Sequence, residues 1–223
     1  MSKIVHPYSH RLGIIRDWKS RWFGMDKKLR EYLKGDVLVR EYLEKKLRGM
    51  YVSSIEIERS EKNMRIIIKT SRPGMIIGRS GDGANALKKD ILAFMKKHAI
   101  AVPQDLKIDI MDVPEPESNA QIVAHVIAEA LEKRMPFRPV MKQTGEKVMA
   151  VRGVKGVKLY MTGRLGGADM ARSEELKLGG IPLQFMRADI DYATDKAHMT
   201  YGDIGIKVWI YKGDSLENEM RNK

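Results

Sequence analysis

Two glycines separated by two residues, Gly78 and Gly81, lie between an apolar run and a lysine-rich segment. Glycine has no Cβ, so this spacing permits a tight turn whose bare backbone can approach a polyanion closely. Arg79 and Ser80 add one cation and one hydroxyl to the loop. The helix expected to begin near Asp82 presents its unpaired N–H groups and the positive end of its dipole at the same place. This combination suits a sugar-phosphate backbone and offers no side chain that reads base edges.

A glycine pair can also simply end one helix before the next, so the elements around the loop decide between the two interpretations. Isoleucines that alternate at 55–57 and stand together at 66–68 predict two strands before the loop. A helical stripe at 84–95 and an alternating apolar run at 106–110 follow it, and residues 29–48 predict a basic amphipathic helix upstream. This order of elements resembles the type II KH fold, whose GXXG loop clamps the backbone of single-stranded RNA.

Charge is unevenly distributed along the chain. The sequence holds 41 Lys and Arg against 29 Asp and Glu, a formal net charge of +12. Residues 1–50, 51–100 and 131–172 carry net charges of +7, +5 and +7, whereas residues 101–130 carry −5 and residues 173–223 carry −2. Charge concentrated in separate blocks favours a polyanionic partner, with nucleic acid first and an anionic membrane second.

Aromatic and basic residues are interleaved in the amino-terminal arm, residues 1–24. Tyr8, Trp18, Trp22 and Phe23 stand among Arg11, Arg16, Lys19 and Arg21. Such a mixture suits irregular folded RNA, whose unpaired bases stack on aromatic rings. Packing of the two tryptophans, four residues apart, onto the following domain is an equally good interpretation. His6 and His10 have a spacing that a metal could use, but no cysteine or nearby acidic ligand completes a site, so no metal is expected.

The remaining sequence predicts an α+β protein of two domains. A KH-like domain with a three-stranded sheet would span residues 25–112, and two prolines among acidic residues mark a linker at 113–117. The second domain, residues 118–212, would pack two helices on a small mixed sheet, and residues 213–223 would form a short tail. Trp209, on the second face of that sheet, could contact RNA or a protein or could simply pack.

Two groups of basic residues in the second domain remain ambiguous on spacing alone. Arg138 and Lys142 are four residues apart and share a helical face, which usually means a solvated surface. The glycine-rich loop at 163–167 lacks the spacing of a nucleotide-binding motif. A turn with an RNA-contacting Arg164 is preferred there, and Arg172, eight residues later, would extend the same basic patch.

Several longer motifs, spread over about 210 residues, resemble those of one protein family. The resemblance is specific because all the motifs occur in the same order along the chain. The chain resembles the bacterial type of small-subunit ribosomal protein S three. The motifs are Val5-His6-Pro7, Arg11-Leu12-Gly13-Ile14, Trp18-Lys19-Ser20-Arg21-Trp22-Phe23, Arg72-Pro73-Gly74-Met75-Ile76-Ile77-Gly78, Gly163-Arg164-Leu165-Gly166-Gly167-Ala168, Arg187-Ala188-Asp189-Ile190-Asp191-Tyr192 and Gly205-Ile206-Lys207-Val208-Trp209-Ile210.

The resemblance implies a structural constituent of the small ribosomal subunit that binds 16S-type rRNA in the subunit head. The rRNA contacts would be His6, Arg11, Lys19, Arg21, Trp22, Arg164 and Arg172. Messenger RNA would be contacted, where it enters the subunit, by Arg134, Arg138 and Lys142. Pro139 stands where the family commonly has a second arginine. The neighbouring head proteins S ten and S fourteen are the protein partners that the family implies.

Other classes of function are less well supported by the residues. No nucleophile, base or acid pair comes together in the sequence, so neither an enzyme nor a cofactor is expected. The absence of cysteine and of any apolar run near eighteen residues favours a soluble cytoplasmic protein without a membrane partner. A free KH-domain regulator of transcription or RNA processing remains the alternative, and it would bind short single strands without residing in a subunit.

Overall fold

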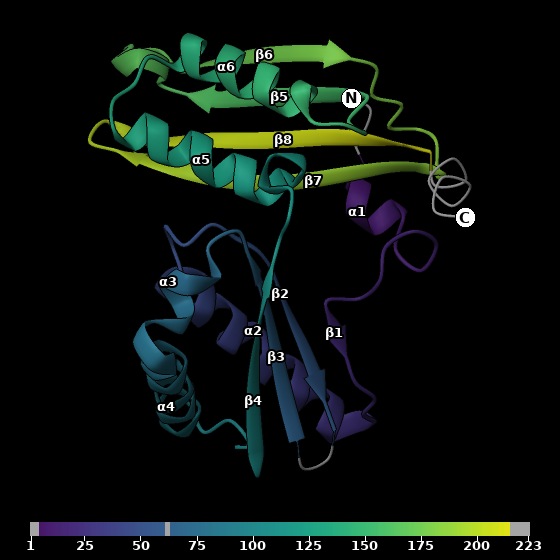
Figure 1. Ribbon diagram of the computed structural model, residues 1–223, viewed down its shortest axis with the longest axis vertical. Coiled ribbons are helices and arrows are strands. Elements are labelled where there is room, and N and C mark those ends of the chain that lie inside the picture. The colour runs from purple at the N-terminus through teal and green to yellow at the C-terminus, as the bar shows by residue number, and fades with distance from the viewer. Residues whose placement is uncertain (1–4, 61–62, 215–223) are drawn as a thin grey trace. The chain divides into compact units, whose positions relative to one another are not determined.

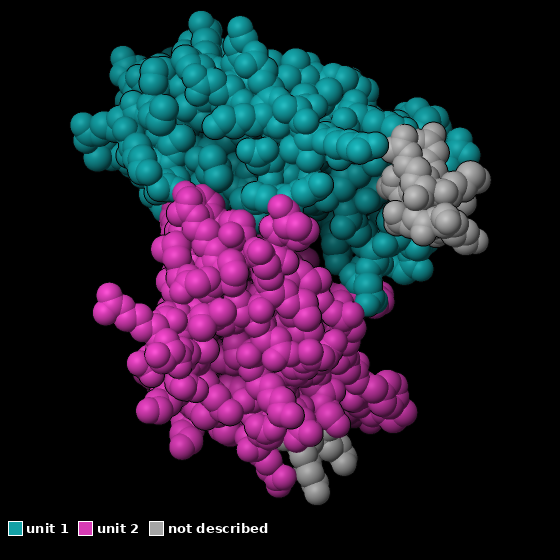
Figure 2. All heavy atoms as spheres, viewed as in Figure 1, with its two compact units in different colours: residues 1–17, 115–223 teal, residues 18–114 magenta. Residues whose placement is uncertain are grey.

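The computed structural model describes residues 5–60 and 63–214. The chain forms two compact units, shown in different colours in Figure 2. The amino-terminal unit comprises residues 18–114, and the carboxyl-terminal unit comprises residues 115–223 together with residues 1–17. Each unit has a hydrophobic core of its own, which confirms the α+β fold class with two domains.

A four-stranded sheet and two long helices make up the amino-terminal unit (Figure 1). Its elements are β1 (Ser20–Arg21), α2 (Asp26–Lys46), β2 (Val52–Arg59), β3 (Asn63–Thr70), α3 (Pro73–Ile77), α4 (Asp82–Lys97) and β4 (Asp105–Asp112). The strands lie in the order β1-β2-β3-β4, with β2 and β3 antiparallel and the outer pairs parallel. The expected sheet had three strands, and β1 is the addition, because two residues carry no periodic signal.

The core of this unit follows from residue spacing. Side chains four residues apart share one face of a helix, and alternate residues share one face of a strand. The residues that meet in the core are Val39 and Leu43 of α2, Leu87, Ile91 and Met95 of α4, Ile55 and Ile57 of β2, and Met64, Ile66 and Ile68 of β3. Burying each large apolar side chain contributes about 1.5–3 kcal/mol. Both helices therefore cover the same face of the sheet.

The carboxyl-terminal unit is a second four-stranded sheet with two helices on one face (Figure 1). Its elements are α1 (Pro7–His10), α5 (Ala120–Glu132), α6 (Phe137–Ala150), β5 (Gly156–Gly163), β6 (Arg172–Gly179), β7 (Ala188–Met199) and β8 (Gly202–Asp214). The order is β6-β5-β8-β7, and every pairing is antiparallel. The prediction of a mixed sheet was therefore wrong in strand direction. Short connections such as that between β7 and β8 reverse the chain and make the neighbouring strands antiparallel.

The helices of this unit divide the sheet between them. α5 packs on β7 and β8, and α6 packs on β5 and β6. The first of these helices begins at Ala120, because Oδ1 of Asn119 caps it by accepting from the backbone N–H groups of Gln121 and Ile122. The expected amino-terminal arm is divided: α1 packs on β7, whereas residues 18–24 belong to the other unit. The expected tail, residues 213–223, begins too early, because Gly213 and Asp214 are the last residues of β8. Its remaining residues, 215–223, lie outside the described residues.

Candidate nucleic-acid interface

The GXXG loop joins α3 to α4 through a backbone that requires glycine. Gly78 has φ 71° and ψ −170°, a conformation essentially confined to glycine, and Gly81 has φ 86°. Ser80 between them also has a positive φ, 53°. A Cβ on Gly83 would lie 2.6 Å from the carbonyl oxygen of Ile76, so α4 can begin this close to α3 only with glycine there. The loop is therefore a fixed, tight turn.

Positive charge and hydrogen-bond donors are exposed at this turn. The side chains of Arg79 and Ser80 are exposed, and within the described part of the chain the guanidinium of Arg79 has no hydrogen bond or ion pair. Gly81 precedes α4 without a side-chain cap, and the N–H of Asp82 donates to the carbonyl oxygen of Arg79. The next N–H groups of the first turn are those that a helix start leaves for an external acceptor. The helix dipole adds partial positive charge at the same end. The geometry is that of an anion-binding turn, and Met75 and Ile77 of α3 expose apolar surface beside it.

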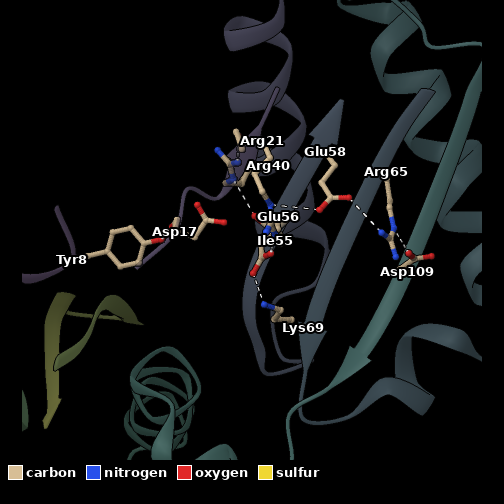
Figure 3. Close-up of polar contacts among 11 residues, drawn as sticks. Tyr8, Asp17, Arg21, Arg40, Ile55, Glu56, Glu58, Arg65, Lys69 and Asp109 are labelled. Atoms are coloured by element: carbon tan, nitrogen blue, oxygen red, sulfur yellow. Dashed lines mark hydrogen bonds and ion pairs between the residues drawn. The ribbon is translucent and has the colours of Figure 1, made fainter. Parts of the chain in front are cut away.

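The face of the amino-terminal sheet that the helices leave uncovered carries a ladder of ion pairs (Figure 3). Glu56 of β2 pairs with Arg21 and with Lys69, at 2.5 Å for the lysine. Arg65 of β3 pairs with Asp109 of β4. These residues alternate with the core residues, so they share the opposite face. The cations on this face are largely balanced by carboxylates of neighbouring strands.

Arg21 and Trp22, which the sequence predicts as rRNA contacts, therefore have partners within the chain. Arg21 also lies 3.5 Å from Glu58, so a phosphate would have to compete with two carboxylates for its guanidinium. Trp22 donates its indole N–H to Oδ2 of the buried Asp36 at 2.6 Å, and its ring lies edge to face with that of Tyr32. Lys19 is exposed. Of these three residues, Trp22 is the one whose side chain is most firmly held by the rest of the chain.

Arg11 corrects the sequence-based assignment most clearly. Its side chain is fully buried, and its guanidinium donates to the carbonyl oxygens of Pro7, Leu183, Phe185 and Ala188. Burial lowers the pKa of Arg11 from its ordinary value, partly offset by the nearby Asp189 carboxylate. In this arrangement no N–H of the group is directed to solvent, so it is a structural clamp and no longer a candidate rRNA contact. His6 is exposed and meets Tyr192 edge to face at 4.7 Å.

Arg138 and Lys142 lie one turn apart on α6 and line a surface hollow of about 490 Å³ with Pro139, Gln143 and Glu146. Both side chains are exposed. Arg138 is 71% exposed and reaches Glu174 of β6 at 3.2 Å, a weak exposed pair. Within the part of the chain that the structure describes, the ammonium group of Lys142 has no hydrogen bond or ion pair. The two cations are available to a polyanion.

Arg134 and Arg172 occupy positions that spacing alone does not reveal. Arg134 is exposed in the connection between the two helices, with φ 62°, rather than on α6. Two guanidinium groups lie over the ring of Phe137: the Cζ of Arg138 is 5.5 Å from the ring centre, and the Cζ of Arg172 is 5.4 Å from it. Arg172 of β6 therefore joins the surface of Arg138, although the sequence grouped it with Arg164.

Arg164 and Trp209 are mainly engaged within the carboxyl-terminal unit. Arg164 donates to the carbonyl oxygens of Ala168 at 2.8 Å and Tyr201 at 3.2 Å, and so holds the turn that follows β5. Trp209 is only 8% exposed and packs on Tyr192 with ring centres 5.1 Å apart. Of the interpretations that the sequence left open for Trp209, packing is the one that the structure supports.

Sequence reasoning missed the partners that several of these side chains have. The carboxylates that pair with Arg21 lie on a strand more than thirty residues away in the chain, and no local pattern indicates them. The sequence offers one weak indication of the contact between Phe137 and Arg172, namely an aromatic residue beside Arg138. The other partner, Arg172, lies on β6 and could not be linked to it from the sequence. Among the described residues no cluster of metal-ligating side chains is present, and no helix there is long and apolar enough to span a membrane.

Comparison with known proteins identifies similar sequences over nearly the whole chain. A family model described as "Ribosomal protein S3, C-terminal domain" matches residues 127–210, and a KH domain model matches residues 38–118. The chain is 48% identical over 216 residues to "Small ribosomal subunit protein uS3" of Caldicellulosiruptor saccharolyticus, which covers 97% of this chain and 94% of that protein. It is 43% identical over 223 residues to the protein of the same name from Clostridium acetobutylicum, covering 100% and 97%.

Proposed function

Because the chain belongs to the family of small ribosomal subunit protein uS3, we propose that it binds the rRNA of the subunit head and contacts messenger RNA where the message enters. Membership of this family makes the protein a structural constituent of the small ribosomal subunit, with the cytoplasmic location of that particle. The family is one of structural proteins rather than enzymes. The rRNA and messenger contacts are the finer part of the proposal.

The GXXG loop is the observation that carries the RNA-binding proposal. An exposed arginine without an ion-pair partner among the described residues, a serine hydroxyl and the uncapped start of α4 stand on one glycine-dependent turn. Such a site attracts a phosphate by charge and by directed N–H groups, whatever the base. Each phosphate neutralised releases counterions, so binding would weaken steeply as salt rises.

The messenger contact is supported by the exposed cations of α6 and its surroundings. Arg138 and Lys142 line one hollow, and Arg172 adds a third cation through Phe137. Pro139 leaves this surface one cation poorer than the family pattern. Arg134 would contribute from the connection before the helix. We propose that these groups hold the phosphates of an incoming strand, with strand opening as a consequence of that hold.

The remaining assignments are proposals of unequal support. Lys19 and His6 are exposed. Arg21 and Arg164 must exchange interactions within the chain for RNA phosphates, and Trp22 would contribute through its ring. The head proteins S ten and S fourteen are proposed as neighbours on the basis of family membership alone.

Sedimentation of a cell lysate through a sucrose gradient tests the proposal. The expected result is co-migration of the protein with small subunits and whole ribosomes that persists after a high-salt wash. The same gradient should be run with the charge-reversing variant Arg79→Glu, which is expected to lower occupancy of the subunit without unfolding the protein. A wild-type protein that remains at the top of the gradient would favour the free KH-domain regulator instead.

A further inference from the structure

A second hollow lies in the amino-terminal unit at the start of α2, away from the GXXG loop. It has a volume of about 590 Å³ and is lined by residues 23–25, Lys28, Tyr32, Arg59 and Ser60. This size falls within the range of small-molecule sites. The sheet order puts β1 and β2 at one edge of the sheet and β4, which α3 contacts, at the other. The hollow is therefore separate from the loop assigned above.

Aromatic and apolar groups form one wall of this hollow. The ring of Phe23 is 81% exposed and the side chain of Met25 is 67% exposed. Tyr32 is held in place, because its ring packs edge to face with that of Trp22, with centres 5.5 Å apart, and the guanidinium carbon of Arg59 lies 4.8 Å from its ring centre. An exposed aromatic ring beside a fixed one is a surface on which a planar group can stack.

The buried Arg59 provides the polar side of the hollow. Its side chain is 5% exposed and its Nη2 donates to Oδ1 of Asp36 at 2.8 Å. The same carboxylate also accepts the indole N–H of Trp22, so one acid serves two donors. Among the described residues, Nε of Arg59 has no hydrogen-bond partner. A buried N–H without an acceptor is costly, and an anion entering the hollow is a natural acceptor once the side chain adjusts.

The first turn of α2 adds further donors at the same place. Met25 precedes this helix of 21 residues without a side-chain cap, so the first backbone N–H groups keep their hydrogen-bonding capacity. The helix dipole favours an anion there, and Lys28 lines the hollow from the same turn. Asp26, the acidic residue of that turn, does not line it.

We propose that this hollow binds a single nucleotide of an unpaired RNA strand. The base stacks on Phe23 beside Tyr32, and the phosphate lies at the first turn of α2 near Lys28 and Arg59. The choice of RNA as the source of the nucleotide rests on the proposed function, whereas the chemistry of the site rests on the geometry above. The full chain would thus contact RNA at two separate places on its amino-terminal unit.

Titration of the isotope-labelled full chain with adenosine monophosphate, followed by backbone amide chemical shifts, tests the site. The expected result is saturable shifts at residues 23–28 and at Ser60, with weaker effects from adenosine or inorganic phosphate alone. Phe23→Ala should weaken binding by about fivefold or more, since stacking on one ring contributes about 1 kcal/mol or more per base. Phe185→Ala, which removes an exposed ring of the other unit, is the control and should change nothing.

The phosphate half has its own matched pair of variants. Lys28→Glu should weaken binding of the monophosphate, whereas Lys27→Glu, the same charge change one residue away and outside the hollow, should have little effect. Absence of shifts at residues 23–28, or equal binding by Phe23→Ala, would overturn the proposal. A short single-stranded RNA added to the same sample reports on residues 79–83. Shifts there but not at the hollow would leave the proposed function standing and remove this inference alone.

Discussion

The Nε of Arg11 donates to the carbonyl oxygen of Ala188 at 2.5 Å, and the two residues are 177 positions apart in the chain. The same guanidinium serves three further carbonyl groups, so it ties α1 to the segment that leads into β7. An arginine in a basic arm is usually interpreted as a ligand for RNA. Here its buried hydrogen bonds make it part of the carboxyl-terminal unit, and this leads to a test.

Replacing Arg11 by methionine should lower the free energy of unfolding by about 3 kcal/mol or more, because buried carbonyl groups lose their donors. Urea denaturation followed by circular dichroism measures the change. Arg152→Met, at an exposed arginine, is the matched control and should be nearly neutral. A loss below about 1 kcal/mol for Arg11→Met would show that solvent can replace the clamp.

Asp36 offers a second test of a buried charge. The change Asp36→Asn leaves the buried guanidinium of Arg59 without its carboxylate, and we expect a loss of about 3–5 kcal/mol in unfolding free energy. The same chemical change in an exposed pair, Asp90→Asn opposite Lys46, should cost no more than about 1 kcal/mol. Denaturation of the two variants side by side gives the answer. An equal loss of unfolding free energy in the two variants would mean that the buried guanidinium of Arg59 does not need the negative charge of Asp36.

The tight turn after α3 predicts a contrast between two glycines. Gly83→Ala would bring a Cβ within 2.6 Å of a backbone carbonyl oxygen, and overpacking of this kind should cost about 2 kcal/mol. Gly74→Ala meets nothing within 4 Å and should lie within about 1 kcal/mol of the wild type, on the stabilising side. Melting temperatures of both variants provide the measurement. A stable Gly83→Ala protein would show that α4 can move away from α3.

The messenger contact predicts an effect on translation speed. Reversing charge with Arg138→Glu and Lys142→Glu together should slow translation through structured messages by about threefold, because phosphate contacts are lost. Subunit assembly should be retained, since both side chains are exposed. The pair Lys147→Glu and Arg152→Glu, also exposed but outside the hollow, controls for net charge. Unchanged speed of the first variant on structured messages would remove α6 from the proposed messenger contact.

The sequence predicts those parts of the fold that depend on local spacing. Leu87, Ile91 and Met95 were expected to share one helical face, and all three are buried in the core. The parts that it could not predict depend on partners far away in the chain. β6 escapes detection as a strand because it lies at a sheet edge, with Leu176 and Leu178 partly covered and the charged Glu175 and Lys177 exposed.

The candidate site divides in the same way. That the GXXG loop forms a tight turn could be predicted, because glycine permits the positive φ of Gly78 and Gly81, whereas the positive φ of Ser80 could not. Whether each arginine side chain is exposed or buried could not be predicted. Residue type alone does not distinguish a cation exposed to solvent from one held by carbonyl groups of another segment. Arg11 and Arg79 are alike in the sequence, yet one is fully buried and the other is exposed.

Ultraviolet crosslinking of purified small subunits that carry a bound messenger, followed by mass spectrometry of this chain's peptides, tests the central claim most directly. We predict rRNA adducts on the peptide containing Arg79 and Ser80, and messenger adducts on the peptides containing Arg138 and Lys142. Adducts found only on other peptides, or none in subunits that contain the protein, would contradict the account of how this chain contacts RNA.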